Sequence, residues 1–380
     1  MRKYEVMRYR AIIQQAGHCI VKDPALSDVI LLWTCGFRKD VLDNSLAEIA
    51  RYEKTYAKRI IVAGCLPDIA PDLLRINFQG RVMPWRCDQE LLKELFGAEG
   101  QAFCDQGVFC EPALTHDVAQ YKKDHPDKDA TFPDQFIKLL VSEGCNYACS
   151  YCSERLAFPA YRSFLPEALK SALRNQLAAT STRQVMLLSD SLGDYGIDIG
   201  TTLPALLDSL MSLDAKIQFA LNNLNPAGFI KFLEPMRAFV KRGAIVHLNI
   251  PIQSASDKIL KLMQRPYARK ELDVIFEMLL TMSFKAFDTH VLIGFPQETD
   301  DDFKQTIAFL QRYKPRYVLA SGYMESSLMP SASLEHKVSE EVKKRRLREF
   351  SYAMQQAGII CNCDDGALVS DRFRRMNALL

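Results

Sequence analysis

Apolar residues in the first hundred positions alternate between short continuous runs and amphipathic stretches. Residues 28–33 and 59–63 are short and rich in β-branched side chains, which is the pattern of strands buried on both faces. Residues 81–85 are a weaker third strand, because their proline suits a sheet edge. Helical periodicity separates these runs at 44–58 and 89–96. This alternation predicts a doubly wound parallel sheet.

A second alternation begins near residue 135. Strands are predicted at 136–141, 184–189, 216–221, 244–252, 289–294 and 317–321. Helices are predicted between them at 165–178, 202–213, 226–241, 269–282 and 300–313, and a further helix follows at 340–356. Six β/α units predict an incomplete (β/α)6 barrel that is open on one side. The Lys-Lys-Arg-Arg run of the last helix most simply forms a solvated face, and contact with nucleic acid is the alternative.

The predicted fold class is therefore α/β, with an N-terminal doubly wound parallel-sheet domain followed by the barrel. The expected divisions are an N-terminal domain at 1–110, a linker at 111–134, the barrel with its terminal helix at 135–357, and a tail at 358–380. The linker assignment rests on its polar, irregular composition.

Composition limits the classes of protein that the chain can represent. Of its 380 residues 48% are apolar and 25% charged, which is typical of a globular protein with a real core. Lys plus Arg number 48 and Asp plus Glu 46, so the formal charge of +2 gives a weak case for nucleic-acid binding. No apolar run is long enough for a membrane span, and the N-terminus lacks a signal-peptide pattern. We therefore expect a cytoplasmic protein without a membrane partner.

The eleven cysteines are the unusual feature. An odd number in a chain without a secretion signal indicates thiols, metal ligation or iron–sulfur clusters rather than a disulfide framework. Cys145, Cys149 and Cys152 lie in SEGCNYACSYC, just after the first barrel strand, where β/α barrels carry their chemistry. A structural zinc would need a fourth ligand close by, and none follows. A four-iron cluster held by three thiolates instead keeps one iron open. A zinc site completed from elsewhere is the alternative.

A C-x3-C-x2-C loop after the first strand of a (β/α)6 barrel resembles the radical S-adenosylmethionine (SAM) enzymes. The resemblance implies a [4Fe-4S] cluster whose open iron chelates the amino and carboxylate groups of SAM. One electron then cleaves a C–S bond and gives a 5′-deoxyadenosyl radical that abstracts hydrogen. It also implies a reductant protein of the flavodoxin or ferredoxin type. Tyr151 matches the family's aromatic position near the adenine, and simple loop packing is its alternative.

Further stretches resemble the radical SAM methylthiotransferases, which place a methylthio group on tRNA bases or on a ribosomal-protein aspartate. These stretches are EGCNYACSYC, LLSDSLGDYGID, IPIQSASDKILKLMQRPY, LIGFPQETDDDF and YMESSLMPSASLEHKVSEEVKKRRL. They occur in the family's order, and the resemblance runs from about residue 29 to about residue 350. Their succession, more than any one of them, is specific.

Strand ends within these stretches supply candidate SAM-binding residues. Besides Tyr151 they are Asp190, Gln253, Arg265, Gly294, Phe295 and Pro296. Gly294 would let the backbone approach a flat ligand such as adenine. Arg265 could reach the SAM carboxylate through a charge-assisted pair, and Asp190 could contact SAM or substrate. Each of them has an alternative as an ordinary strand-end or helix-cap residue.

The methylthiotransferases bind a second four-iron cluster through three N-terminal cysteines. Cys35 in the TC motif and Cys65 in the GC motif match two of these. The family's first cysteine follows an earlier strand, and this chain begins too late to contain it. Parallel strands would gather Cys35, Cys65 and Cys87 at one sheet edge, so Cys87 is the predicted third ligand, with Cys104 and Cys110 as rivals. That none of them binds a cluster is also open.

Three cysteines remain without an assigned role. We expect Cys19 to be a buried thiol at the end of the first helix. Cys361 and Cys363 are either incidental or part of a tail that folds over a site.

Three functions are compatible with these features. The first is a two-cluster radical SAM enzyme that inserts sulfur, with or without methylation, at an unactivated C–H bond. The second is a radical SAM enzyme of the same ancestry with different C–H chemistry or transfer of a SAM fragment. The third is a non-enzymatic metal- or RNA-binding module, which the SAM motifs argue against.

The expected substrate of the first function is a small molecule or a peptide. The 358–380 tail is too short for the family's RNA-binding β-barrel, and the charge is near neutral. A tRNA or ribosomal-protein substrate stays an alternative, because Arg372, Arg374 and Arg375 leave some capacity to contact RNA.

Overall fold

The computed structural model describes residue 6 and the ranges 9–10, 13–14, 16–37, 39–56, 59–85, 88–97, 110–111, 136–158 and 160–363. The predictions for Cys87, Cys104, Arg372, Arg374 and Arg375, and for nearly all of the 111–134 linker, lie outside the described residues.

The N-terminal part is built on a three-stranded parallel sheet. Its strands are β1 (Val29–Thr34), β2 (Arg59–Gly64) and β3 (Arg81–Val82), in the order β1-β2-β3. Its helical elements are η1 (Pro24–Leu26), α2 (Lys39–Thr55), α3 (Leu66–Ile69), α4 (Pro71–Asn77) and α5 (Asp88–Phe96). Apolar side chains of α2 and α4 pack on one face of the sheet, and Leu92 of α5 packs on the other. The predicted doubly wound sheet is therefore confirmed.

The second part is an eight-stranded sheet in the order β13-β12-β11-β10-β9-β8-β5-β4. Its strands are β4 (Cys110–Glu111), β5 (Ile137–Leu140), β8 (Gln184–Leu188), β9 (Gln218–Leu221), β10 (Ile245–Asn249), β11 (Phe287–Ile293), β12 (Tyr317–Gly322) and β13 (Ile360–Cys363). All neighbours pair in parallel except β4 with β5. The two end strands of this order, β13 and β4, do not pair with each other. The barrel is therefore open, as predicted.

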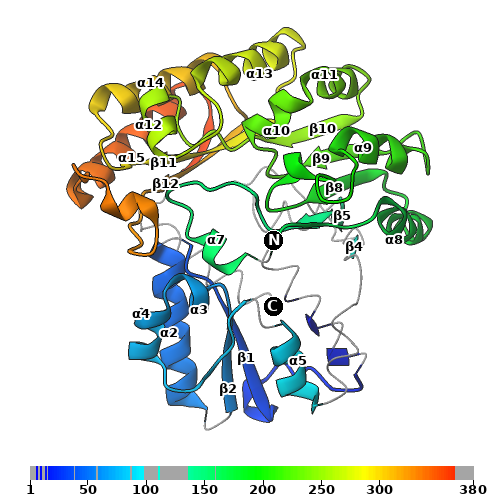
Figure 1. Cartoon of the computed structure of the whole chain (residues 1–380), viewed down its shortest axis with the longest axis vertical. Coiled ribbons are helices and arrows are strands. Elements are labelled where there is room, and N and C mark those ends of the chain that lie inside the picture. Colours follow the sequence, from blue (N-terminus) through cyan, green and yellow to red (C-terminus); the bar gives the residue numbers. More distant parts are fainter. Residues whose placement is uncertain are drawn as a thin grey trace.

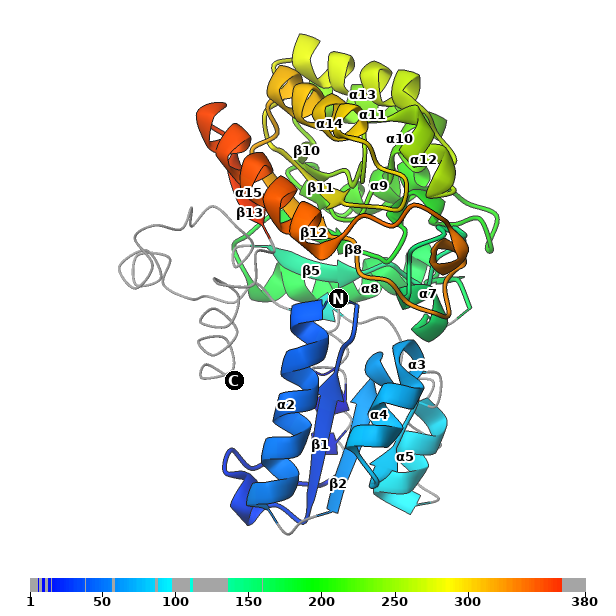
Figure 2. The ribbon, with the colours of Figure 1, turned by 90° about the vertical axis from the view of Figure 1, so that its left-hand side faces the viewer.

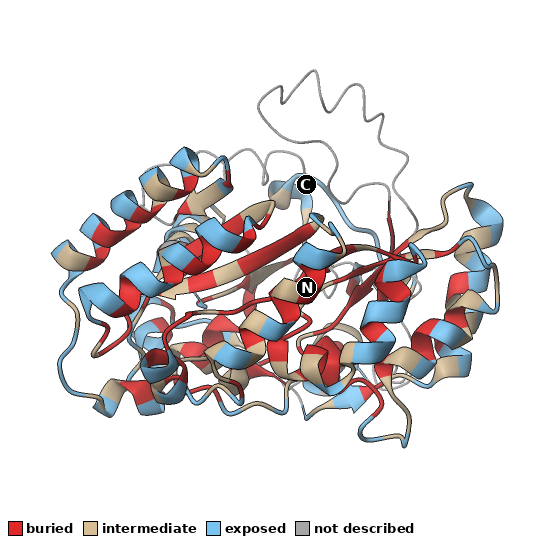
Figure 3. Cartoon of the chain, turned by 90° about the horizontal axis from the view of Figure 1, so that it is seen from above, coloured by how far each residue is buried: buried red, intermediate tan, exposed pale blue. Residues whose placement is uncertain are grey.

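Helices cover the outer face of this sheet. They are α8 (Pro166–Ala179), α9 (Leu203–Met211), α10 (Pro226–Lys231), α11 (Leu233–Lys241), α12 (Asp257–Leu262), α13 (Arg269–Thr281), α14 (Asp300–Tyr313) and α15 (Glu340–Gln356). Shorter elements are α7 (Glu154–Ala157), η3 (Leu192–Asp194), η4 (Pro330–Ser333) and a hairpin of β6 (Ser142–Glu143) with β7 (Arg162–Ser163). Figure 3 shows buried residues along the strands and the inward sides of the helices.

The barrel sheet extends beyond its expected boundaries at both ends. Cys110 pairs with Leu139 of β5, although residue 110 was assigned to the N-terminal domain. Ile360 pairs with Tyr317 of β12, although the tail was expected to begin at 358. Both added strands are too short to show periodicity, and each pairs with a strand distant in the sequence.

The basic run of α15 is the second difference from expectation. Lys343 and Arg346 are only 7% and 4% exposed, so the run is not a uniformly solvated face. They share the buried side of the helix with Leu347, Phe350 and Met354. A spacing of three and four residues places these five positions on one helix face.

Helix α7 lies where the two parts meet (Figures 1 and 2). Ala157 of α7 packs in one cluster with Cys65, Ile69 and Trp85 of the N-terminal part. Within the described chain, none of the helices combines the length and apolar character needed to cross a membrane.

Candidate active site

The three-cysteine loop is anchored at both ends. Gly144, with φ of +81°, precedes Cys145 and donates its backbone N–H to Oδ2 of Asp190 at 2.9 Å. Ser150 donates its hydroxyl to the Leu262 carbonyl oxygen at 2.8 Å. The loop is thereby fixed between the end of β8 and the end of α12. Asp190, a candidate SAM or substrate contact, holds the start of the loop in this structure.

A second polar network holds the middle of the loop. The Tyr147 hydroxyl donates to Oδ1 of Asp194 at 3.2 Å, and the Ser191 hydroxyl donates to Oδ2 at 2.8 Å. Burial raises the pKa of Asp194, while Ser191 and Tyr147 oppose that rise. The sequence showed these residues only as part of a family-like stretch, without indicating that they support the cysteine loop.

The three thiols influence one another electrostatically. Burial raises the pKa of Cys145 to about 11, and Cys149, Asp194 and Asp190 add to the rise. Burial also raises the pKa of Cys152, with contributions from Glu154, Cys149 and Cys145. The three thiols therefore lie close enough to influence one another, and their role as ligands of one cluster stays a prediction.

The donor set of the loop consists of three cysteine thiols. A four-iron cluster places each thiolate on a different iron, so its ligands stand farther apart than those of zinc. Three thiols on one loop, without a local fourth ligand, match a cluster with one open iron.

Arg265 lies against this loop. Its Nη1 donates to Sγ of Cys149 at 3.1 Å, and its Nε donates to the Tyr267 hydroxyl at 2.7 Å. Nη1 is also 3.4 Å from the Tyr151 hydroxyl. Burial raises the pKa of Tyr267 to about 12, although Arg265 opposes the rise. Arg265 thus places a positive charge beside Cys149, a predicted cluster ligand, and a SAM carboxylate would have to share that charge.

Tyr151 and Phe295 belong to one apolar cluster. Their ring centroids are 6.3 Å apart in an edge-to-face arrangement, and Phe295 contacts Tyr323 at 5.1 Å. Ile259 and Met263 complete the surrounding packing. Burial raises the pKa of Tyr151, and Arg265 opposes it. The structure therefore brings two predicted SAM-binding residues together, next to Cys149.

The backbone conformation and the packing around position 294 require a glycine there. Its φ is +78°, and a Cβ at this position would overlap Cγ of Lys343 on α15. Its N–H donates to Oε2 of Glu298 at 2.7 Å. The sequence suggested a different reason for this glycine, namely close approach of adenine. Pro296 is buried on the same loop.

Gln253 occupies a left-handed backbone conformation with φ of +65°. Its N–H donates to the His290 carbonyl oxygen at 2.8 Å, and its own carbonyl accepts from the Leu292 N–H at 2.9 Å. The backbone of Gln253 is therefore tied to β11, whose end carries Gly294.

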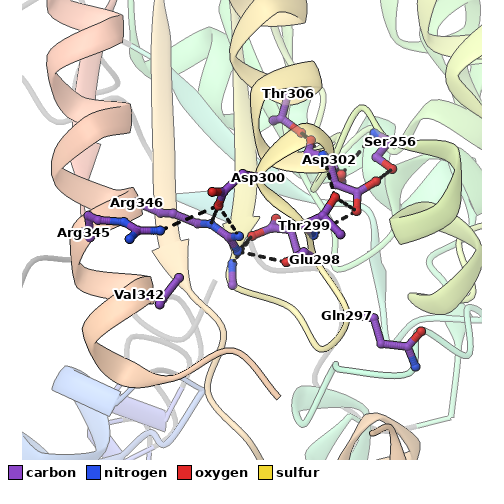
Figure 4. A network of polar contacts seen from close by, with 12 residues as sticks. Ser256, Gln297, Glu298, Thr299, Asp300, Asp302, Thr306, Val342, Arg345 and Arg346 are labelled. Carbon is purple, nitrogen blue, oxygen red and sulfur yellow. Dashed lines mark hydrogen bonds and ion pairs between the residues drawn. The ribbon is translucent and has the colours of Figure 1, made fainter. Parts of the chain in front are cut away.

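Glu298 and Arg346 are site-supporting residues that the sequence reasoning missed (Figure 4). Nη1 of Arg346 donates to Oε2 of Glu298 at 2.9 Å, and Nη2 lies 2.7 Å from Oδ1 of Asp300. Burial raises the pKa of Glu298 to about 7, and the Gly294 N–H and Arg346 oppose it. The helical spacing of Arg346 with Leu347 and Phe350 was the available indication of its burial.

Cys35 and Cys65 lie side by side at the carboxyl edge of the N-terminal sheet. Thr34 of β1 is in register with Gly64 of β2, which places the next two Cα atoms 4.9 Å apart. The two sulfur atoms form a disulfide in the structure, whereas the sequence predicts them as ligands of a second cluster. The parallel register explains the pairing, and it also places the two thiols as neighbouring cluster ligands require.

The environment of these thiols contains an unsatisfied donor. Nε1 of Trp33 is buried and has no hydrogen-bond partner among the described residues. Trp33 and Cys35 border the cluster in which Cys65 and Trp85 pack against Ala157 of α7. A sulfur-rich group bound at this edge would give the indole N–H an acceptor, so the unpaired donor is compatible with a second cluster.

The remaining described cysteines lie in three different places in the fold. Cys110 lies on β4, at the edge of the barrel sheet. Cys19 is exposed, and the prediction that it is buried is wrong, because it lies in the irregular segment just before η1. Cys361 and Cys363 lie on β13 with their sulfur atoms 3.2 Å apart, packed on the barrel core.

Two family models match the chain. The model described as the radical SAM superfamily matches residues 139–310, and uncharacterized protein family UPF0004 matches residues 1–82. A probable threonylcarbamoyladenosine tRNA methylthiotransferase of Pyrococcus horikoshii is 26% identical over 321 residues, covering 82% of this chain and 72% of that protein. The ribosomal protein uS12 methylthiotransferase RimO of Thermosipho melanesiensis is 26% identical over 352 residues, covering 89% and 77%.

Two solved structures share the fold. One is the radical SAM methyltransferase TsrM from Kitasatospora setae with cobalamin and a [4Fe-4S] cluster bound, with a TM-score of 0.56 at 12% identity, covering 80% of this chain and 66% of that chain. The other is the cobalamin-dependent SAM radical enzyme OxsB, with a TM-score of 0.52 at 12% identity, covering 92% and 50%. This chain thus spans between half and two thirds of each solved chain. At this identity the likeness concerns the fold alone.

An open (β/α)6 barrel with three thiols after its first strand defines an enzyme of the radical SAM class, which uses SAM and a [4Fe-4S] cluster. The two matched regions and the relatives together support a radical SAM methylthiotransferase-like family for this chain. Enzymes of this kind carry a second four-iron cluster, and the resemblance inferred from the sequence is confirmed.

Proposed function

We propose that this protein inserts sulfur, with or without methylation, at an unactivated C–H bond of a small molecule or peptide. In this proposal Cys145, Cys149 and Cys152 hold the radical-generating cluster. Cys35 and Cys65, once their disulfide is reduced to two thiolates, hold the second cluster together with Cys87, the third ligand predicted from the sequence.

The main support for the proposal is the position of α7, which contacts the N-terminal part beside Cys65. This helix begins two residues after Cys152, and its Ala157 packs directly against Cys65. Cys152 therefore lies just before the first residue of this four-residue helix, and Cys65 packs against its last residue. Delivery of a sulfur atom to a carbon radical requires such proximity, because the reacting atoms must come into contact.

The side chains around the loop have distinct roles in this proposal. When bound, SAM and the first cluster supply the 5′-deoxyadenosyl radical and the second cluster supplies sulfur. Arg265 offsets negative charge beside Cys149, and Tyr151 with Phe295 offers an apolar wall for a flat adenine. Asp190 and Asp194 keep the loop in place through Gly144 and Tyr147.

Iron and sulfide analysis of anaerobically purified protein tests the proposal. We expect about eight irons per chain, and about four would contradict the second cluster. Replacing Cys145, Cys149 and Cys152 together with Ala should abolish 5′-deoxyadenosine formation and leave about four irons. If 5′-deoxyadenosine still forms, the assignment of this loop is wrong.

A second candidate substrate class comes from the relatives. Their names describe modification of tRNA adenosine or of ribosomal protein uS12. The near-neutral charge of this chain, +2 in 380 residues, favours the small-molecule or peptide alternative. Mass spectrometry of digested tRNA and ribosomal protein, from cells with and without the gene, distinguishes a macromolecular substrate from a small molecule or peptide. Loss of a methylthio group from either macromolecule would contradict the proposed substrate class.

A further inference from the structure

One face of helix α15 reaches the loop that follows β11. Arg346 donates from Nη1 to the carbonyl oxygen of Glu298 at 3.1 Å as well as to its carboxylate. Lys343, one helical turn earlier, donates from Nζ to the Tyr323 carbonyl oxygen at 2.9 Å. Lys and Arg side chains are rarely buried without such partners. Two buried basic residues of one helix therefore contact the strand ends beside the SAM-binding loop.

The contact continues through Glu298 to the loop backbone. Oε2 of Glu298 accepts both the Gly294 N–H at 2.7 Å and Nη1 of Arg346 at 2.9 Å. Because one oxygen atom joins both donors, a change in the guanidinium position also changes the partner of Gly294. The methylene stem of Lys343 fills the space that a Cβ on Gly294 would need. Gly294 is thus held by hydrogen bonding and by packing.

Asp300 gives Arg346 a second point of attachment. Nε and Nη2 of Arg346 donate to Oδ1 of Asp300 at 3.2 Å and 2.7 Å. Asp300 is the first residue of α14, whereas Glu298 lies in the loop before it. Figure 4 shows Arg346 reaching both carboxylates, with Arg345 approaching Asp300 separately. A planar guanidinium can bridge two carboxylates in this way, and an ammonium group cannot do so with the same geometry.

We propose that Arg346 and Lys343 are positioning residues for SAM. Through Glu298 and Gly294 they fix the loop backbone at 294–296 in the conformation that binds the cofactor. This inference rests on the proposed function, in which that loop and Tyr151 line the SAM site. Neither basic side chain touches SAM, and both act through the loop.

Equilibrium dialysis of SAM with full-length, anaerobically reconstituted protein tests the inference. Arg346→Met should weaken SAM binding about 10-fold, because it removes charge-assisted hydrogen bonds from a buried carboxylate. The KM for SAM in 5′-deoxyadenosine formation should rise more than kcat falls, with the iron content unchanged. Arg346→Lys should recover part of the affinity. Arg348→Met, which changes an exposed arginine of the same helix, is the matched control and should bind SAM like the wild type.

Two outcomes would overturn the inference. One is an Arg346→Met protein that keeps its iron and binds SAM as tightly as the wild type. The other is unchanged SAM affinity in Glu298→Gln, a variant that removes the carboxylate charge but retains an acceptor for the Gly294 N–H. This second variant provides the test if Arg346→Met does not fold. Glu298→Gln should weaken SAM binding at unchanged iron content, and unchanged affinity would contradict the positioning role. A wild-type protein that binds no SAM would instead contradict the proposed function.

Discussion

The Nη1 atom of Arg265 lies 3.1 Å from the Sγ atom of Cys149. This contact joins the end of α12 to the three-cysteine loop across more than a hundred residues of sequence. It places a fixed cation beside one of the three thiols. Arg265 also contacts Tyr151 and Tyr267, so a single guanidinium connects the cluster loop with the aromatic wall.

Arg265→Met should therefore slow SAM cleavage by about 10- to 100-fold, since a hydrogen bond to a charged group is worth about 1.5–3 kcal/mol. The iron content should fall little, because all three thiols remain. The rate of 5′-deoxyadenosine formation and the iron content of the same sample provide the measurement. Lys270→Met, at an exposed position on α13, serves as the control. Equal rates in the two variants would show that the Arg265 contact is dispensable.

Replacement of Cys87 by Ala should remove about four irons and leave 5′-deoxyadenosine formation intact, because the barrel cluster keeps its own ligands. Cys104→Ala is the matched comparison and should retain about eight irons. If the effects of the two substitutions are reversed, Cys104 is the third ligand. If neither changes the iron content, both assignments fail.

Gly294→Ala should destabilise the protein more than Gly243→Ala. Both glycines have φ above +70°, so each substitution carries the left-handed backbone penalty of about 1–2 kcal/mol. Only the Cβ at 294 would meet another residue, Lys343, whereas the space around Gly243 is open. Urea unfolding of both variants measures the difference. Equal losses would show that Lys343 moves aside freely.

Glu298 should make the stability depend on pH between about 4.5 and about 7. Burial raises its pKa from 4.5 to about 7 in the folded protein. The folded state therefore binds the proton more tightly, and the associated stability is present below the unfolded pKa and is lost as pH rises through the folded one. The loss is on the order of 3 kcal/mol.

Glu298→Gln should lack this component of the pH dependence. The charged groups that act on the carboxylate are Arg346 of α15 and Asp302 of α14, and they are unchanged in the variant. Urea unfolding of both proteins at pH about 5 and about 8 gives the comparison. Parallel curves for the two proteins would contradict the shifted pKa.

The barrel could be predicted because its strands are continuous apolar runs of almost the observed lengths. Helix α14 (Asp300–Tyr313) and helix α15 (Glu340–Gln356) have the bounds that their periodicity indicated. The strand β13 (Ile360–Cys363) could not be found in this way, since its sequence ICNC is short and partly polar and its stability comes from pairing with β12.

The sequence by itself indicated the chemistry of the site, because the spacing of Cys145, Cys149 and Cys152 after a barrel strand predicts the ligands of a cluster. It also indicated that Cys35 and Cys65 end neighbouring parallel strands. Only the tertiary structure decided which distant groups support them. Arg265 reaches Cys149, Ala157 meets Cys65, and Arg346 reaches Glu298 through contacts between segments far apart in the chain. Local periodicity indicates which face of a helix is buried. It does not indicate which distant residues contact that face, because those contacts form only when the chain packs.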